Sequence, residues 1–186
     1  DKCDDLHTDL HECLGHGSGR LLDGVTPDAL KSYSSTIEEA RADLFGLYYM
    51  ADMKLLELGL LDSAEAYKSA YYSYMLNGLL TQEAHMRNRA LIARWCYEKG
   101  KPEGVVEMYK DGGKTYVRIN DYVRLRTLFA RLLAEIQRIK SEGDYEAARS
   151  MVEKYGVNVD EELHREILDR YNRLNLAPYK GFINPV

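Results

Sequence analysis

The sequence predicts a mainly α-helical fold with one small β-hairpin. Apolar residues recur at helical spacing along most of its 186 residues, and capping residues and glycines delimit these stretches. Strand-like segments occur on both sides of Asp111-Gly112-Gly113, which is typical of a tight hairpin turn. We find no internal repeat and no linker. Residues 1–186 are therefore expected to form a single helical domain.

Caps and glycines define the helices expected in the first hundred residues. Thr26 followed by Pro27 is typical of an N-cap and the first helical position. Ser35 and Glu38 have the spacing of a capping box, which predicts the start of a long helix that ends near Gly59. A serine at position 63 caps the next helix. The expected helices are residues 4–14, ending at the glycine-rich run 15–19, a helix starting at Thr26, and residues 35–58, 65–80 and 81–98.

The remainder of the chain is expected to hold the hairpin, three helices and a tail. The strands are predicted at residues 105–109 and 115–119, after a glycine and a proline that end the preceding helix. Gly143 and Gly156 are expected to break the helical pattern that follows. The last helices are predicted at residues 121–141, 145–155 and 161–174, before an extended tail with two prolines.

Composition excludes several functional classes. The formal charge of −5 argues against a nucleic-acid partner, because phosphate binding needs concentrated Lys and Arg. No run of 18 apolar residues is present, so no membrane span is expected. Three cysteines suggest no disulfide framework and fit a reducing compartment. We therefore expect a monomeric, cytoplasmic protein with no nucleic-acid or membrane partner.

The run with the clearest chemistry is His11-Glu12-Cys13-Leu14-Gly15-His16. Two histidines around a glutamate resemble the zinc-peptidase signature, in which the imidazoles bind metal and the glutamate is general base. Here the histidines are one residue further apart, and at i,i+5 they would diverge by about 140° around an α-helix. The helix must therefore bulge or stop within the motif, and Gly15 supplies the backbone freedom. Alone, the run fits a capped helix as well as a metal site.

A second cluster, Glu38-Glu39-Ala40-Arg41-Ala42-Asp43, lies near the start of the long predicted helix. The helix dipole favours carboxylates there, so ordinary first-turn acids remain an alternative. Glu39 and Asp43 nevertheless share a helix face. Glu39 as a third ligand, with Asp43 or Glu38 holding the imidazole N–H groups, would complete a site for one Zn²⁺ per chain. Three protein ligands are typical of a catalytic rather than a structural zinc.

HECLGH together with EEARAD resembles the dipeptidyl peptidase III metallopeptidases, peptidase family M49, whose hallmarks are HEXXGH and a following EE-x-R-A-[E/D] helix. The resemblance implies that Glu12 is the general base. It implies that the zinc ligands are His11, His16 and Glu39. The acids that support these ligands in the family match Glu38 and Asp43.

The resemblance extends downstream. The segment from Glu83 to Arg89 is similar to the family's E/Q-AHMQAR segment, which implies a role for His85 in transition-state stabilisation. Arg89 matches the family's arginine one turn later and is expected to bind substrate. Without the resemblance, His85 would be interpreted as a hydrogen-bonded helix residue. His7, outside both motifs, is expected at the surface.

The resemblance implies a zinc exopeptidase that releases dipeptides from the N-termini of short peptides. Family members are much longer, so we expect the chain to be the C-terminal part of such an enzyme, holding the catalytic lobe and partnered by an N-terminal lobe. The short segment between the two motifs resembles bacterial members. The alternative is a zinc-binding helical scaffold without activity of its own. A purely structural zinc site is disfavoured, because Glu12 would then have no role.

Overall fold

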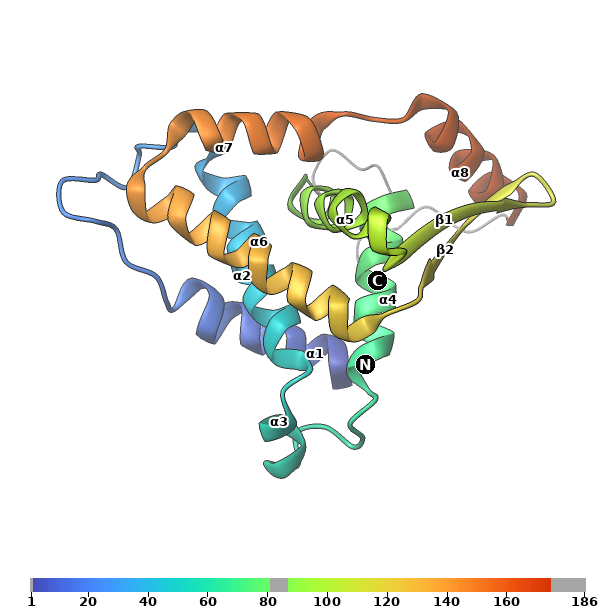
Figure 1. Ribbon diagram of the computed structural model, residues 1–186, viewed down its shortest axis with the longest axis horizontal. Coiled ribbons are helices and arrows are strands. Elements are labelled where there is room, and N and C mark those ends of the chain that lie inside the picture. Colours follow the sequence, from blue (N-terminus) through green and yellow to red (C-terminus); the bar gives the residue numbers. More distant parts are fainter. Residues whose placement is uncertain (1, 81–86, 175–186) are drawn as a thin grey trace, which may run out of the picture.

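A computed structural model describes residues 2–80 and 87–174 of the chain. It confirms a mainly α-helical fold with one two-stranded antiparallel sheet (Figure 1). The α-helices are α1 (Lys2–Leu10), α2 (Ser34–Met50), α3 (Met53–Glu57), α4 (Tyr67–Leu80), α5 (Arg87–Gly100), α6 (Tyr122–Glu142), α7 (Tyr145–Met151) and α8 (Glu161–Leu174). The strands and the shorter helical segments are β1 (Val106–Asp111), β2 (Lys114–Ile119), η1 (His11–His16), η2 (Lys31–Tyr33), η3 (Lys101–Glu103) and η4 (Val152–Val157).

Helices α2, α5 and α6 form the centre of the described fold. α2 contacts α1, α5 and α6, while α5 also contacts α4 and η4. Figure 1 shows α6 crossing in front of α2, with α5 seen nearly end on. Their fully buried side chains include Ile37, Leu44, Leu47, Leu91, Ile92, Leu125, Phe129, Leu132 and Ile136. Each such burial contributes roughly 1.5–3 kcal/mol, so this core holds α2 firmly against its neighbours.

The first helix continues into the histidine motif without stopping. α1 passes directly into η1, a π-helical turn from His11 to His16, and Gly17 follows as its C-cap. An α-helix to Leu14 that ends at the glycine run was therefore the wrong prediction. The helix was expected to bulge or stop within the motif, and it bulges, because the i→i+5 hydrogen bonds of a π-helix are such a bulge.

The long helix predicted through residue 58 is in fact two helices. α2 ends at Met50, and α3 begins after Asp52. Asp52 has an extended backbone and is the N-cap of α3, because its side chain accepts a hydrogen bond from Lys54 N at 2.9 Å. Such an N-cap starts a new helix, and the apolar pattern does not register the break. The predicted capping box is also absent, because Tyr33 occupies the N-cap of α2 and makes no side-chain cap bond.

Two further predicted boundaries shift. Thr26 and Pro27 start no helix: residues 27–30 form turns, and only the short η2 precedes α2. Gly156 does not break the helical run either, because it lies inside η4, the π-helical segment that extends α7 to Val157. Both errors concern short, irregular helical geometry, which caps and glycines alone do not distinguish from regular helix.

The hairpin lies where the turn residues predict it. Gly112 and Gly113 join β1 to β2 with φ values of +53° and +75°, a left-handed pair that a tight hairpin turn requires. α8 lies against β2: Glu166 accepts hydrogen bonds from Thr115 N at 2.6 Å and Thr115 Oγ1 at 2.7 Å, and Arg170 donates to Thr115 O at 2.8 Å. Side chains of α8 thereby satisfy backbone groups at the edge of the sheet.

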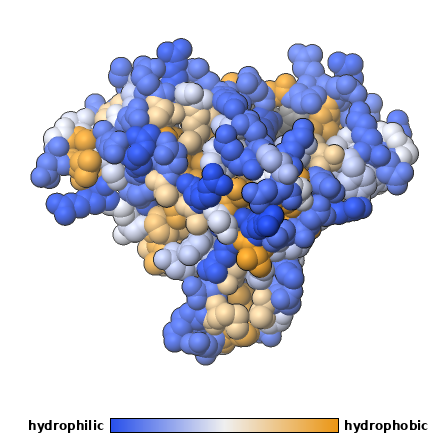
Figure 2. All heavy atoms as spheres, viewed as in Figure 1, coloured by the Kyte–Doolittle hydropathy of each residue, from blue (hydrophilic) through white to orange (hydrophobic). Residues whose placement is uncertain are grey.

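Polar and charged side chains cover much of the surface seen in Figure 2. Apolar side chains are exposed around α3, at the lower tip of the molecule, where Met53, Leu58 and Leu60 are exposed. Within residues 2–80 and 87–174, no helix combines the length and apolar character that a membrane span requires.

Candidate metal centre

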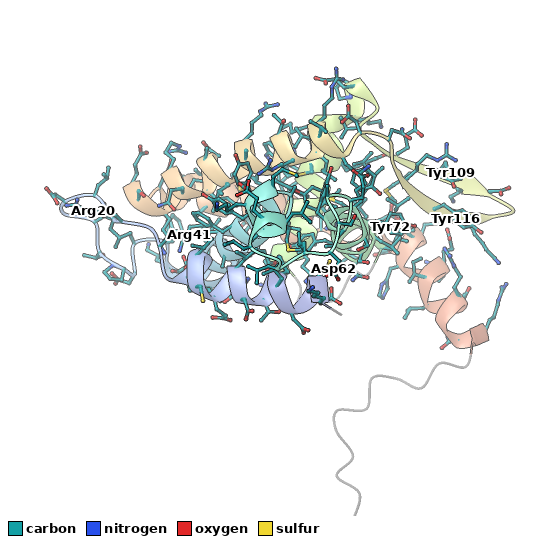
Figure 3. All side chains as sticks on the ribbon, turned by 90° about the horizontal axis from the view of Figure 1, so that it is seen from below. Arg20, Arg41, Asp62, Tyr72, Tyr109 and Tyr116 are labelled. Atoms are coloured by element: carbon teal, nitrogen blue, oxygen red, sulfur yellow. The ribbon has the colours of Figure 1, made fainter. Side chains whose placement is uncertain are left out.

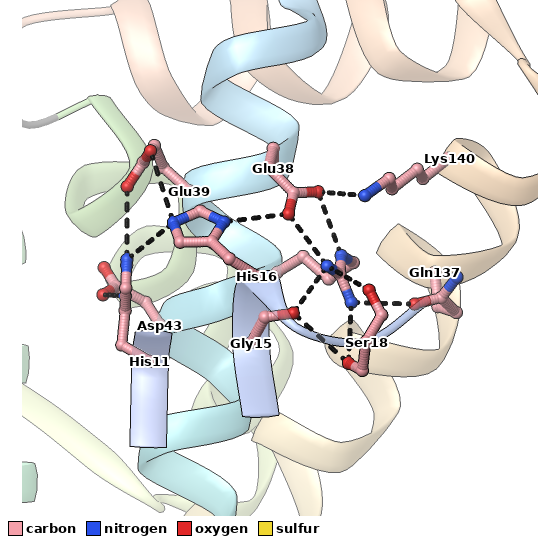
Figure 4. A network of polar contacts seen from close by, with 10 residues as sticks. His11, Gly15, His16, Ser18, Glu38, Glu39, Asp43, Gln137 and Lys140 are labelled. Carbon is pink, nitrogen blue, oxygen red and sulfur yellow. Dashed lines mark hydrogen bonds and ion pairs between the residues drawn. The ribbon is translucent and has the colours of Figure 1, made fainter. Parts of the chain in front are cut away.

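η1 and α2 bring the three predicted metal ligands together (Figure 4). His11 Nε2 and His16 Nε2 lie 3.0 Å apart. Glu39 Oε2 is 3.5 Å from His11 Nε2, and Glu39 Oε1 is 3.7 Å from His16 Nε2. A regular α-helix would aim the two rings about 140° apart, whereas the π-helical turn places their centroids at 4.7 Å. The i,i+5 spacing of the two histidines therefore suits the π-helical backbone of η1.

The other nitrogen of each ring is held by a carboxylate. His11 Nδ1 is 2.8 Å from Asp43 Oδ1, and His16 Nδ1 is 3.0 Å from Glu38 Oε1. An ionised carboxylate can only accept, so each Nδ1 carries the hydrogen, and in the neutral ring each Nε2 then keeps its lone pair. Pairing of this kind fixes the tautomer and orientation of histidines that bind metals.

This donor set fits a zinc ion. Both Nε2 atoms and the Glu39 carboxylate face one space, and in neutral rings these acceptors repel each other unless a proton or a metal ion lies among them. Two nitrogens bound to one tetrahedral zinc at about 2.0–2.1 Å are roughly 3.3 Å apart, close to the 3.0 Å observed between His11 and His16. Neutral imidazole and carboxylate are ligands that zinc accepts.

Glu12 is exposed and borders the same space. One of its carboxylate oxygens and a ring nitrogen of each histidine lie within 4.8 Å of one another. Distance alone therefore allows either Glu12 or Glu39 as the third ligand. Glu39 is the better candidate, because its two oxygens approach both Nε2 atoms to 3.7 Å or less.

Asp43 is supported from two other helices. Asp43 is only 4% exposed, and its Oδ2 accepts hydrogen bonds from Tyr74 of α4 at 2.6 Å and from Asn88 of α5 at 2.8 Å. Burial favours the neutral acid, but the hydrogen bonds from His11 and Tyr74 outweigh it and lower the pKa of Asp43. Burial and the nearby Asp43 charge raise the pKa of Tyr74 well above its usual range, so Tyr74 is a neutral donor.

Glu38 is held by two cations. Burial favours its neutral form, yet hydrogen bonds from Arg41, Lys140 and His16 lower the pKa of Glu38 to about 2. Arg41 Nε and Nη2 donate to the two carboxylate oxygens at 3.1 and 2.8 Å, and Lys140 of α6 contacts Oε2. The carboxylate that holds His16 is therefore ionised at neutral pH.

Sequence reasoning missed Arg41, Lys140, Tyr74 and Asn88. Arg41 had a local signal, because it follows Glu38 at i,i+3 on one helix face. The other three lie on α6, α4 and α5, far along the chain, where no local pattern marks them.

The predictions for His85, Arg89 and His7 have different outcomes. His85 falls outside the described residues. The guanidinium of Arg89 lies 5.5 Å from the ring centroid of Tyr74, the residue that donates a hydrogen bond to Asp43. Arg89 and His7 also line a pocket of about 70 Å³. The role of Arg89 in substrate binding stays a prediction. His7 is half-buried, with Nε2 3.3 Å from Asp43 O, and burial lowers its pKa. Its predicted surface position was wrong, because α1 packs its face against α2.

Two histidines and a glutamate gathered on a helical fold, with each imidazole held by a carboxylate, form a candidate metal centre of the kind that metallopeptidases use. Residues 25–173 match the model of Peptidase family M49. The chain belongs to peptidase family M49, whose members are metallopeptidases, and a metal cofactor is implied. The matched segment includes Glu38, Glu39 and Asp43 and begins after η1.

Two curated relatives show how much of a longer protein the chain represents. It is 27% identical to dipeptidyl peptidase 3 of Mus musculus over 208 residues, covering 84% of this chain and 28% of the relative. It is 30% identical to Nudix hydrolase 3 of Arabidopsis thaliana over 161 residues, covering 80% of this chain and 19% of the relative. The chain thus spans less than a third of either protein. An animal and a plant relative do not test the expected bacterial origin.

The fold is similar to that of a solved structure, DPP III from Caldithrix abyssi. The TM-score is 0.70 at 25% sequence identity, and the similarity covers 91% of this chain and 32% of that one. The likeness thus includes nearly the whole chain.

Proposed function

We propose that this chain carries the metal centre of a zinc exopeptidase that releases dipeptides from the N-termini of short peptides. In this proposal His11, His16 and Glu39 bind Zn²⁺, and Glu12 is the general base. The observation that carries it is the convergence of the two Nε2 atoms at 3.0 Å beside the Glu39 carboxylate. Membership of a peptidase family supports the reaction class.

The side chains divide the chemistry among them. Bound zinc would supply Lewis acidity, which lowers the pKa of a water to about 7 and polarises a peptide carbonyl. Glu12 accepts the proton of the attacking water and delivers it to the leaving amine. Asp43 and Glu38 keep the imidazoles in the tautomer that leaves Nε2 unprotonated. Transition-state assistance by His85 and substrate binding by Arg89 belong to the same proposal.

One observation favours a second candidate. The chain spans 28% of the mouse relative, so the substrate cleft in this proposal also needs a wall from an N-terminal lobe. A chain of this length could bind zinc and yet cleave nothing by itself. The second candidate is therefore a zinc-binding helical module whose activity depends on that lobe.

Zinc content tests the proposal directly. Wild-type chain, reconstituted with zinc and dialysed, is expected to hold about one ion, because a site with three protein ligands binds tightly at neutral pH. Glu39→Ala should lose most of it. Glu57→Ala, which removes an exposed carboxylate on α3 paired with Lys54, is the control and should keep it. A wild type that takes up no zinc, or a Glu39→Ala variant that keeps it, would refute the ligand assignment.

A dipeptide-release assay separates the two candidates. The 186-residue chain and a longer form with the N-terminal lobe would be compared on short peptides with free N-termini. Activity in both supports a self-sufficient enzyme, and activity only in the longer form supports the dependent module. No activity in a zinc-loaded longer form would refute the exopeptidase proposal.

A further inference from the structure

Arg41 is the most deeply buried charged side chain in the described part of the chain, at 0% exposed. Figure 3 shows it in the interior, whereas Arg20 lies at the tip of the preceding loop. Its guanidinium reaches three segments: the end of η1, α2 itself, and α6, where Nη1 is 3.3 Å from Gln137 Oε1. A buried charge is costly and often stabilises no more than an apolar side chain would. The burial of Arg41 is better explained by the groups that it orients than by a contribution to the stability of the fold.

One arm of Arg41 caps the π-helical turn. Nη2 donates to Gly15 O at 2.7 Å and to Ser18 O at 2.8 Å. Carbonyls at the end of a helix lack intrahelical partners and carry partial negative charge, so a cation there is favourable. The same turn is seated tightly, since a Cβ on Gly15 would lie 2.6 Å from Ala42 Cα. Arg41 and Ala42 together fix the backbone just before His16.

The same guanidinium also acts on the ring of that histidine. Arg41 Nε and Nη2 bind both oxygens of Glu38, and Glu38 Oε1 accepts from His16 Nδ1 at 3.0 Å. Lys140 reaches the same carboxylate from α6. One guanidinium thus holds His16 twice, at its backbone and at its imidazole. Only the planar, five-donor fork of arginine can reach both sides at once.

We propose that Arg41 is a positioning residue of the metal centre, acting on His16 through Gly15 and Glu38, with Lys140 as its auxiliary. The inference rests on the proposed metal site but concerns a residue outside the ligand set. Its consequence is that the affinity for metal depends on a side chain that never touches the ion.

The test is Arg41→Lys in the 186-residue chain, which keeps the charge and loses the fork. Zinc affinity, measured by competition with a chelator, is expected to fall about 10–100-fold, the usual effect of removing a supporting partner. The visible absorption of the Co²⁺-loaded chain should also shift, because His16 moves. Zinc affinity and a cobalt spectrum like those of the wild type would overturn the proposal.

Leu125→Ala is the control for lost stability. Leu125 is fully buried on α6, about 22 Å along that helix from Lys140, so its truncation destabilises the fold away from the site. Its cobalt spectrum should match the wild type. If Leu125→Ala shifted the spectrum as Arg41→Lys does, general loosening would explain both, and the proposal would fail.

Two further measurements cover a variant that does not fold or a chain that binds no metal. Lys140→Met removes a side chain that is 27% exposed and touches Glu38 but no η1 carbonyl. We expect a loss of zinc affinity of several-fold, and an unchanged affinity would contradict a role of Lys140 in holding His16 through Glu38.

In metal-free protein, the ¹⁵N shifts of the His16 ring report its tautomer. Wild type should show a single Nδ1–H form, and the Arg41 or Lys140 variant a mixture, whether or not zinc binding is found; an unmixed tautomer in the variant overturns the inference.

Discussion

Tyr74 donates its phenol hydrogen to Asp43 Oδ2 at 2.6 Å, while the other oxygen of the same carboxylate faces His11 Nδ1 at 2.8 Å. The two bonds fix the plane of a carboxylate that is almost fully buried. Since the raised pKa of Tyr74 keeps it a donor, the charge of Asp43 stays directed at His11. A phenol on α4 thereby supports a metal-ligand candidate on η1.

Tyr74→Phe keeps the ring and removes this bond. We expect the free energy of unfolding to fall by about 1.5–3 kcal/mol, the usual contribution of a hydrogen bond to a charged group. Zinc affinity should fall about tenfold, because Asp43 loses part of its orientation. Denaturant unfolding and chelator competition measure the two effects.

Tyr71→Phe is the matched control for that variant. Tyr71 is buried on the same helix and donates to Leu47 O at 2.8 Å, a neutral acceptor outside the site. Its loss should cost about 0.5–1.5 kcal/mol of stability and leave zinc affinity unchanged. Equal zinc affinities in the two variants would contradict the link from Tyr74 to the metal centre.

Glu12→Gln separates chemistry from metal binding. In an active form of the protein, dipeptide release should fall about 10²–10⁴-fold, since an amide cannot accept the proton of water. Zinc content should stay the same, because Glu39 rather than Glu12 completes the ligand set. Asp9→Asn, an exposed neutralisation on α1, is the control and should keep its rate. Loss of zinc in Glu12→Gln would assign Glu12 to the ligands instead.

Gly15→Ala tests the close contact between η1 and α2. The added methyl carbon would lie 2.6 Å from Ala42 Cα, so one segment must move. We expect a loss of about 1–3 kcal/mol of stability from overpacking and weaker zinc binding, because His16 is the next residue. Gly100→Ala is the control: its Cβ would meet Leu128 Cδ1 at 3.0 Å in the core. It should lose stability and keep zinc, and the opposite pattern would reject the argument.

Glu166→Ala should loosen α8 from the hairpin without affecting zinc. Removing the acceptor of Thr115 N should speed hydrogen exchange of that amide, equivalent to about 1–3 kcal/mol of lost local protection. Unchanged exchange would show that other contacts hold α8.

The same contact should depend on pH. Burial favours the neutral form of Glu166, but hydrogen bonds from Thr115 outweigh it and lower the pKa of Glu166. A pKa lowered from the usual 4.5 means that the stabilisation is complete above that value and is lost as the pH falls through the lowered pKa of Glu166. Shifts of the Thr115 amide followed by NMR in acid should show this loss in the wild type and not in Glu166→Ala.

Local signals predicted the parts of the fold that local chemistry decides. Asp121 caps α6 by accepting from Arg124 N at 2.8 Å, and Gly143 ends it with φ +66°. The break at Asp52 was missed, because the apolar spacing continues across it and the sequence does not distinguish an aspartate that caps a helix from one on its surface. In the motif, the i,i+5 spacing predicted that the helix would bulge or stop, and only the structure shows that it forms a π-helical turn.

The candidate site likewise has a part that local sequence predicts and a part that it does not. His11, Glu12, His16 and the α2 acids lie in two short runs whose residue types and spacing are distinctive. Their supports are single residues from distant helices, such as Tyr74, Asn88 and Lys140, and a lone tyrosine or lysine carries no signal of what it will contact. Only the tertiary arrangement of α2, α4, α5 and α6 brings them to the site.

All three proposed ligands, their two partner carboxylates and Arg41 come from residues 11–43, but the other supports come from α4, α5 and α6. The centre is therefore not portable. Grafted onto another helical scaffold, residues 11–43 would carry every ligand and Arg41, but would lose Tyr74 and Asn88, which donate to Asp43, and Lys140, which contacts Glu38. A transplant would need to bring the packing of the donor fold with it, so the smallest transferable unit is most of the described chain.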